Sequence, residues 1–151
     1  MTKNNIASAP QVEKTAFTIL FIVSFCHFLN DSINSMLPAI YPMLKSEFAL
    51  SFGQIGLITL VLQITSSIVQ PLVGMYADKH RHSWQLSVGM LLTLTGIFML
   101  SYSMSYPMIL ISVALLGCGS SIFHPQASQV AQAASGGRKG LAQSIFQVGG
   151  N

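Results

Sequence analysis

The stretch FTILFIVSFCHFLNDSINSMLPAIYP, residues 17–42, is a long apolar run with polar side chains in its middle. A helix of about 20 residues crosses the roughly 30 Å hydrocarbon layer of a bilayer, so this run is long enough to span it. A charged group at the bilayer centre costs at least ~2.5 kcal/mol on insertion scales, so the polar face is expected to turn toward other helices or a water-filled cavity. The polar residues are spaced i, i+3, i+4 and i+7 on one helix face, and they are His27, Asn30, Asp31 and Asn34.

The composition is that of a membrane protein with several spans. Of the 151 residues, 51% are hydrophobic and 7% are charged, whereas about 25% of residues are charged in an ordinary soluble domain. The net charge of +3 comes from basic residues that lie between apolar runs and form no patch, so no nucleic-acid partner is expected. Cys26 and Cys118 both lie in apolar segments and are expected to pack as small apolar side chains.

Apolar runs of membrane-spanning length follow one another along the chain. We predict an all-α membrane bundle, with a disordered cytoplasmic tail over residues 1–16 and an incomplete N-terminal transmembrane bundle over residues 17–151. The first span is expected to end at Pro38 and Pro42, because proline cannot continue a regular helix. The last run covers only about half a bilayer, so we expect the chain to be a fragment of a longer protein. The predicted spans lie near residues 17–40, 52–76, 84–102, 107–132 and 141–151.

Lysine and arginine alternate between the two sides of the predicted bundle. The first and third connections between spans together hold only Lys45, whereas the tail and the second and fourth connections hold six basic residues. Under the positive-inside rule, the N-terminus is expected on the cytoplasmic side of the plasma (inner) membrane. The six basic residues are Lys3, Lys14, Lys79, Arg81, Arg138 and Lys139.

The second span repeats the polar spacing of the first. Gln63, Ser66, Ser67 and Gln70 are again spaced i, i+3, i+4 and i+7, and two helices with matching polar faces indicate a shared cavity. The alternative is that these groups only join helices by hydrogen bonds. The third span carries small residues on one face, which we interpret as packing only; they are Gly89, Thr93 and Gly96.

Two titratable side chains inside the spans are candidates for proton or substrate handling. Asp31 is the only formal charge within the predicted spans, and a carboxyl at membrane depth can take up and release a proton. Its expected partner is His27, one helical turn earlier; the alternative is a structural carboxylate bonded to a neighbouring helix. His124 in the fourth span is an imidazole that titrates near neutral pH, so it is a further candidate.

The turn after the second span has a recognisable pattern. Gly74 is followed four residues later by Asp78 and then by the basic residues Lys79 and Arg81. A glycine allows close helix contact, and an aspartate at a helix end can pair with basic groups. The pattern resembles the signature of the major facilitator superfamily between its second and third helices, although Tyr76 stands where that signature has an aliphatic residue.

Longer strings resemble the fosmidomycin resistance branch of that superfamily. They are LNDSINSMLPAIYPMLKSEFALSFGQIGLITL, QPLVGMYADK and GSSIFHPQASQVAQAASGGRKGLAQSIFQVGGN. The resemblance implies a twelve-helix efflux transporter of drug-like molecules or phosphonates, driven by a proton gradient and requiring no cofactor. It also implies that this chain holds four helices and half of a fifth from the first bundle, with the second bundle as its missing partner. The arginine that the superfamily carries in its fourth helix is absent near residues 113–117.

Two other functions remain open at this point. The chain could be a small membrane exporter that associates with copies of itself, or an adaptor that transports nothing and binds the helices of a partner. An enzyme is not expected, because the sequence shows no nucleophile and base pair and no metal-ligand spacing. His80 and His82 lie in a charged turn and are expected to be solvated.

Overall fold

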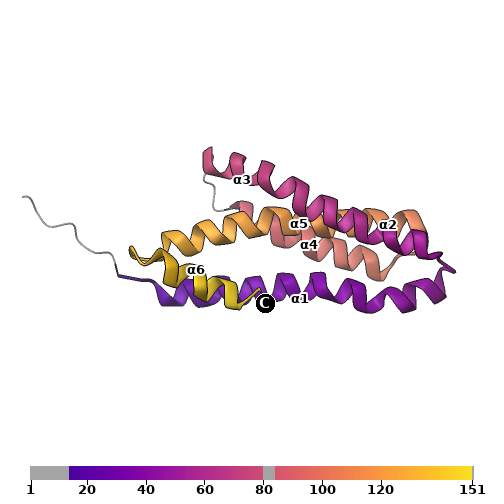
Figure 1. Cartoon of the computed structure of the whole chain (residues 1–151), viewed down its shortest axis with the longest axis horizontal. Helices are drawn as coiled ribbons and strands as arrows, with labels where there is room; N and C mark the ends of the chain where they lie inside the picture. The colour runs from indigo at the N-terminus through magenta and orange to yellow at the C-terminus, as the bar shows by residue number, and fades with distance from the viewer. Residues whose placement is uncertain (1–13, 80–83, 151) are drawn as a thin grey trace, which may run out of the picture.

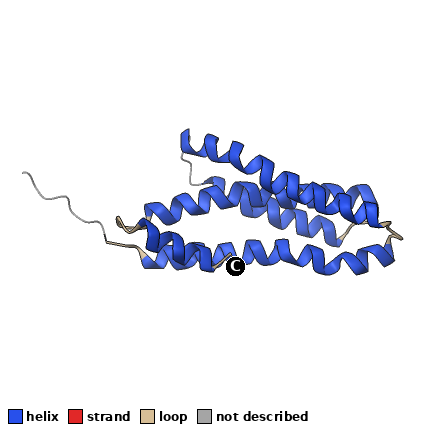
Figure 2. Ribbon diagram, viewed as in Figure 1, coloured by secondary structure: helices blue, strands red, loops and turns tan. Residues whose placement is uncertain are grey.

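The structure is a computed structural model that describes residues 14–79 and 84–150, and it is an elongated bundle of helices (Figure 1). The described residues form helices joined by short turns, without strands, as the blue helices and tan turns of Figure 2 show. The all-α prediction is therefore confirmed. The elements are α1 (Phe17–Glu47), α2 (Phe52–Gln63), the π-helix η1 (Ile64–Ile68), α3 (Val69–Lys79), α4 (Trp84–Ser101), α5 (Tyr106–Ala133) and α6 (Lys139–Val148).

Four helical stretches are long and apolar enough to cross a membrane. Their large apolar side chains lie mainly on the outside, where lipid would surround them; Phe21, Phe25 and Ile68 are examples. In the second stretch, α2, η1 and α3 follow one another as one interrupted helix. The four stretches are Phe17–Glu47, Phe52–Tyr76, Trp84–Ser101 and Tyr106–Ala133.

Helix α1 does not end at its prolines, so that part of the sequence prediction is wrong. Pro38 and Pro42 both lie inside the helix, which continues to Glu47. A proline removes its own hydrogen bond to the preceding turn, and packed membrane helices tolerate that loss. The 31 residues of α1 span about 46 Å, which exceeds the hydrocarbon layer and leaves Lys45 and Glu47 at its end.

The disordered tail predicted over residues 1–16 includes Thr15 and Ala16, which the structure shows bonded to the helical bundle. The backbone N–H of Ala16 donates to the carbonyl of Ala134 over 2.9 Å, and the hydroxyl of Thr15 donates to the carbonyl of Ser135 over 2.8 Å. These bonds attach the start of α1 to the end of α5, because the backbone groups at both helix ends need partners. The prediction for residues 1–13 lies outside the described residues.

Helices α4 and α5 pack backbone against backbone. A Cβ added to Gly96 would lie 2.7 Å from the nitrogen of Leu116 and 2.8 Å from the carbonyl oxygen of Ser112. At Gly89 the nearest atoms are the Gly119 carbonyl oxygen and the Phe123 nitrogen, both at 3.0 Å. Only glycine permits such an approach, so the predicted packing face of the third span is confirmed.

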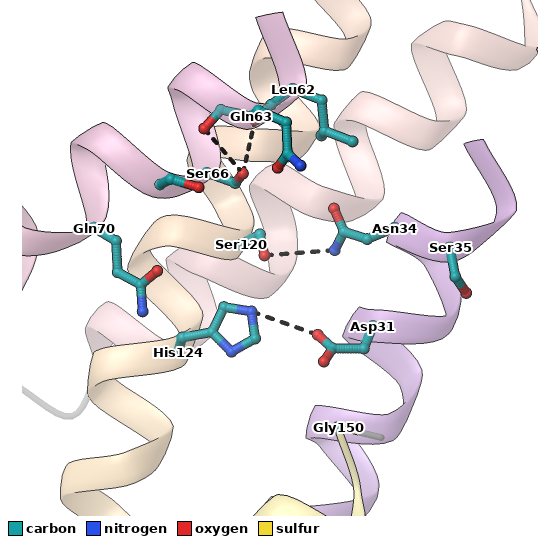
Figure 3. Close-up of a pocket in the computed structure, with 11 residues that line it drawn as sticks. Asp31, Asn34, Ser35, Leu62, Gln63, Ser66, Gln70, Ser120, His124 and Gly150 are labelled. Carbon is teal, nitrogen blue, oxygen red and sulfur yellow. Dashed lines mark hydrogen bonds and ion pairs between the residues drawn. The ribbon is translucent and has the colours of Figure 1, made fainter. Parts of the chain in front are cut away.

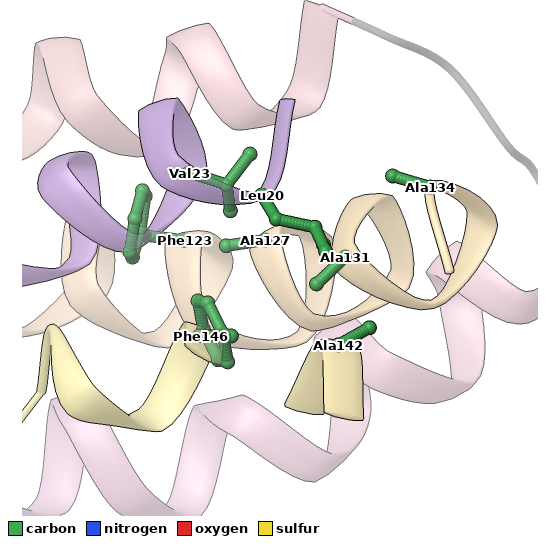
Figure 4. Close-up of a cluster of buried hydrophobic side chains, with 8 residues drawn as sticks. All are labelled: Leu20, Val23, Phe123, Ala127, Ala131, Ala134, Ala142 and Phe146. Atoms are coloured by element: carbon green, nitrogen blue, oxygen red, sulfur yellow. The ribbon is translucent and has the colours of Figure 1, made fainter. Parts of the chain in front are cut away.

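Helix α6 turns back along the first half of α1 (Figure 1). The turn from α5 contains Gly136 and Gly137 at φ of 56° and 85°, a left-handed backbone that glycine adopts without strain. Lys139 begins α6 and so is helical rather than part of a basic loop. Figure 4 shows the core that joins α1, α5 and α6. It consists of Leu20, Val23, Phe123, Ala127, Ala131, Ala134, Ala142 and Phe146.

We predict that Gly96→Ala lowers the apparent melting temperature of the detergent-solubilised chain. The new methyl group would press on the backbone of α5, which cannot move as a flexible side chain can, at a cost of about 1–3 kcal/mol. The measurement is loss of monodisperse protein on heating, followed by size-exclusion chromatography. Gly56→Ala is the matched control, because that helical glycine has no atom within 4 Å of an added Cβ. Equal melting temperatures for the two variants would contradict the close packing.

Candidate functional site

The polar faces of the first two predicted spans border one cavity, together with part of α5 (Figure 3). Its volume is about 450 Å³. Of the residues proposed from the sequence, Asp31, Asn34, Gln63, Gln70 and His124 lie on its wall, whereas His27 and Asn30 lie buried behind it. The full lining is Asp31, Asn34, Ser35, Leu62, Gln63, Ser66, Ser67, Gln70, Ser120, His124 and Gly150.

A π-helical turn forms part of this wall. Element η1 interrupts the α-helical hydrogen-bond pattern between Gln63 and Val69. Inside it, the hydroxyl of Thr65 donates to the carbonyl of Val61 over 2.8 Å, and the hydroxyl of Ser66 donates to the carbonyl of Leu62 over 2.7 Å. These side chains satisfy carbonyls next to the irregular turn, and π-turns inside helices are frequent at functional sites.

Asn30 joins three helices at the depth of the bundle. Its side chain is fully buried. The amide nitrogen donates to the hydroxyl of Ser120 on α5 over 3.3 Å, and the amide oxygen accepts from the hydroxyl of Thr93 on α4 over 3.2 Å. The same nitrogen lies 3.1 Å from Asp31 Oδ1. Asn30 therefore positions the carboxylate and ties α1 to its neighbours, which goes beyond the packing role predicted for Thr93.

Asp31 lies between two imidazoles. Its Oδ2 is 3.3 Å from His27 Nε2, one turn earlier on α1, and its Oδ1 is 3.4 Å from His124 Nε2 on α5. Figure 3 shows the side chains of His124 and Asp31 facing each other, with the interaction between them dashed. The partner expected for Asp31 within its own helix is present, and the structure adds the second histidine from another helix.

His27 is held in place from α6. Its Nδ1 lies 3.0 Å from the carbonyl oxygen of Phe146, and its ring stacks on the Phe146 ring with centroids 4.2 Å apart. The hydroxyl of Ser24 donates to the carbonyl of Ile145 over 2.8 Å. A Cβ at Gly150 would collide with the His27 ring, so the backbone after α6 approaches this imidazole closely. The ring orientation is therefore fixed from two sides.

The motif after the second span, Gly74 to Arg81, contributes no described residue to the lining of the cavity. An added Cβ at Gly74 would be 3.9 Å from the Cβ of Pro125, an ordinary van der Waals contact, so the described helices do not use the closer approach that a glycine allows at this position. Lys79 is exposed at the end of α3. Asp78 belongs to α3, but its side chain is outside the described part, as is Arg81 altogether.

The fold and cavity define a polytopic membrane protein with a polar, titratable interior, the general plan of a secondary transporter. The chain belongs to the Major Facilitator Superfamily, whose family profile matches residues 20–151. This bears out the resemblance read from the sequence.

Two curated relatives align with nearly all of this chain. The fosmidomycin resistance protein of Escherichia coli K12 is 52% identical over 145 residues, which cover 96% of this chain and 36% of that protein. The MFS-type transporter YfnC of Bacillus subtilis 168 is 44% identical over 151 residues, covering 95% and 37%. This chain thus spans little more than a third of the length of these relatives. No solved structure matches it.

Three contributors to the site were missed from the sequence. The sequence does not single out Ser120, and it predicts Thr93 only as part of a packing face, because the partner of a hydroxyl on another helix leaves no local pattern. The carbonyl of Phe146 carries no side-chain signal at all. The position of His124 next to Asp31 likewise depends on how α5 packs against α1. The cluster of His27, Asp31 and His124 could therefore not be predicted from the sequence.

We predict that Thr93→Val destabilises the bundle by about 1 kcal/mol. The substitution keeps the shape of the side chain but leaves the buried amide oxygen of Asn30 without its hydroxyl donor. The measurement is the unfolding midpoint in mixed detergent micelles. Thr95→Val is the matched control, since that exposed hydroxyl bonds only the carbonyl of Leu91 in its own helix. A midpoint for Thr93→Val that equals the control would count against the Asn30 network.

Proposed function

We propose that this chain forms one wall of the translocation pathway of a proton-coupled exporter of small molecules, with drug-like or phosphonate substrates. The observation that carries the proposal is the carboxyl of Asp31, which faces a polar cavity inside the spans with an imidazole on either side. Ionisable groups at membrane depth are costly and mark ion and substrate pathways. The 52% identity to a protein named for fosmidomycin resistance supports efflux rather than another transport role.

The proposed coupling uses Asp31 as the group that exchanges the proton. As a carboxylate it attracts His27 within α1 and His124 on α5, and so holds these two helices together. When the carboxyl takes up a proton, that attraction weakens and the imidazole of His124 is released from Asp31. Protonation would thereby change which helix arrangement is favoured, and a transporter needs such a link between its proton and its two access states.

The substrate is proposed to bind at the cavity wall. Gln63 and Gln70 offer amide donors and acceptors from one side, and Asn34 offers an amide from the other. The lining holds no lysine or arginine. An anionic substrate such as a phosphonate would therefore meet the imidazole of His124 in its protonated form, and further cations would have to come from other helices of the transporter.

The rest of the pathway is proposed to come from a second helical bundle. Sites of such transporters lie between two halves near the middle of the membrane, and the relatives are almost three times as long as the region they share with this chain. The same proposal places the protein in the plasma (inner) membrane with the N-terminus in the cytoplasm, because the basic connections alternate in that sense.

We predict that Asp31→Asn abolishes proton-coupled efflux in a transporter that contains this sequence. The amide has the shape of the carboxyl but cannot gain or lose a proton in the transport cycle. The measurements are the drug concentration that inhibits cell growth and substrate-induced proton movement in inverted membrane vesicles. Membrane-inserted protein is quantified by immunoblot to show that insertion is intact.

Glu47→Gln is the matched control for this test. It removes a carboxyl at the exposed end of the same helix, away from the cavity. We expect its efflux to stay at the starting level. Full resistance and full proton movement in Asp31→Asn would refute the coupling role.

A further inference from the structure

We propose that His27, Asp31 and His124 form a binding site for a divalent transition-metal cation of the zinc class. Two imidazole nitrogens and the Asp31 carboxylate would be its ligands, and the fourth coordination position would face the cavity. The structure supports the site by geometry, by the fixed ring of His27 and by the chemistry of the ligand set. Metal binding requires no transport, so this inference does not rest on the proposed function.

The separations of the three groups fit metal coordination. Their ligand atoms all lie within 4.8 Å of one another. Zinc bonds to nitrogen and oxygen are about 2.0–2.1 Å, so two ligands of a tetrahedral ion lie roughly 3.4 Å apart. The separation between His27 Nε2 and Asp31 Oδ2 is 3.3 Å, and that between His124 Nε2 and Asp31 Oδ1 is 3.4 Å, so each imidazole lies at this spacing from one of the two carboxylate oxygens. Charge-assisted hydrogen bonds between nitrogen and carboxylate are shorter, about 2.7–2.9 Å.

The contacts of His27 orient its Nε2 atom toward the proposed metal, where it can act as a ligand. A carbonyl oxygen only accepts hydrogen bonds, so the Nδ1 atom that lies 3.0 Å from the Phe146 carbonyl carries the hydrogen. In a neutral ring, Nε2 then presents its lone pair to the Asp31 carboxylate, and two acceptors face each other. A proton on Nε2, which makes the ring an imidazolium that attracts the carboxylate, resolves this conflict, and so does a metal cation bound between the two groups; proton and metal therefore compete for the same nitrogen. Metal-binding histidines characteristically donate their other nitrogen to a backbone carbonyl or a carboxylate in this way.

The ligand set selects the kind of cation. Two imidazoles with one carboxylate suit zinc and its neighbours, such as cobalt and nickel, whereas magnesium and calcium prefer oxygen ligands alone. The site is also accessible, because the side chains of Asp31 and His124 are 30% and 26% exposed and both border the cavity. A water molecule or a substrate group could therefore complete a tetrahedron. Asn30, which donates to Asp31 Oδ1, would orient the carboxylate.

The test is metal binding to the purified full chain in detergent micelles. His80 and His82 are first replaced by asparagine in every sample, because a His-x-His turn can bind metal on its own. Zinc is titrated by calorimetry, and cobalt by its visible absorption, which reports tetrahedral coordination. We expect one equivalent of zinc per chain and a tetrahedral cobalt spectrum. Absence of stoichiometric binding in this background would overturn the proposal.

Variants locate the site within the chain. His124→Asn and Asp31→Asn are expected to weaken zinc binding by at least roughly 100-fold, since each removes a direct ligand. Gln63→Ala is the matched control, because it changes the same cavity wall without removing a proposed ligand. Unchanged zinc affinity in both ligand variants would overturn the proposal.

A variant that gains a spectroscopic signal distinguishes the loss of a metal ligand from poor folding of the chain. His124→Cys replaces one ligand by a thiolate, which also binds zinc and cobalt. We expect this variant to bind cobalt and to show a near-ultraviolet thiolate-to-cobalt absorption band that the starting chain lacks. A folded His124→Cys chain that binds cobalt without that band would show that position 124 is not a ligand. A result of this kind leaves the proton-coupling proposal standing, because efflux in Asp31→Asn tests that proposal separately.

Discussion

The need to satisfy a buried amide at membrane depth shapes this bundle. Asn30 is fully buried, and an unpaired polar group in a hydrocarbon environment costs several kcal/mol. Its partners Thr93 and Ser120 come from α4 and α5, so one side chain fixes the distances of two helices from α1. Because α4 and α5 are themselves in backbone contact at Gly96 and Gly119, the three helices have little freedom to slide.

The orientation of α1 follows from that anchor. With Asn30 turned toward α4 and α5, the next residue, Asp31, points to the cavity, where it meets His124. The opposite face of α1 presents residues such as Phe21 and Phe25 to the outside. Helix α1 thus carries three faces: one toward lipid, one packed against other helices and one toward the polar cavity. The packing of α1 against its neighbours keeps lipid away from the titratable groups at the cavity.

Much of this arrangement follows from periodicity. The i, i+3, i+4 spacing predicts that Asp31 shares a face with His27 and Asn30, since helix geometry is local. The division of that face between cavity and buried interior could not be predicted, because it depends on where α4, α5 and α6 pack. The same holds for the Phe146 carbonyl that fixes His27. The continuation of α1 through Pro38 was missed because proline rules describe isolated helices, whereas packed membrane helices tolerate the lost bond.

The polar faces of the first two spans are expected to line a water-filled cavity within the membrane-spanning region. Single cysteines, in a chain whose own cysteines are replaced by serine, test it by reaction with a charged, water-soluble thiol reagent in native membranes. We predict that cysteines at Gln63 and Gln70 react rapidly, because both positions border the cavity. Cysteines at Leu60 and Ile68, exposed on the outside of the same interrupted helix, should remain unmodified in lipid. Equal reaction at all four positions, or none at the two glutamine positions, would show that these polar faces do not line a water-filled cavity.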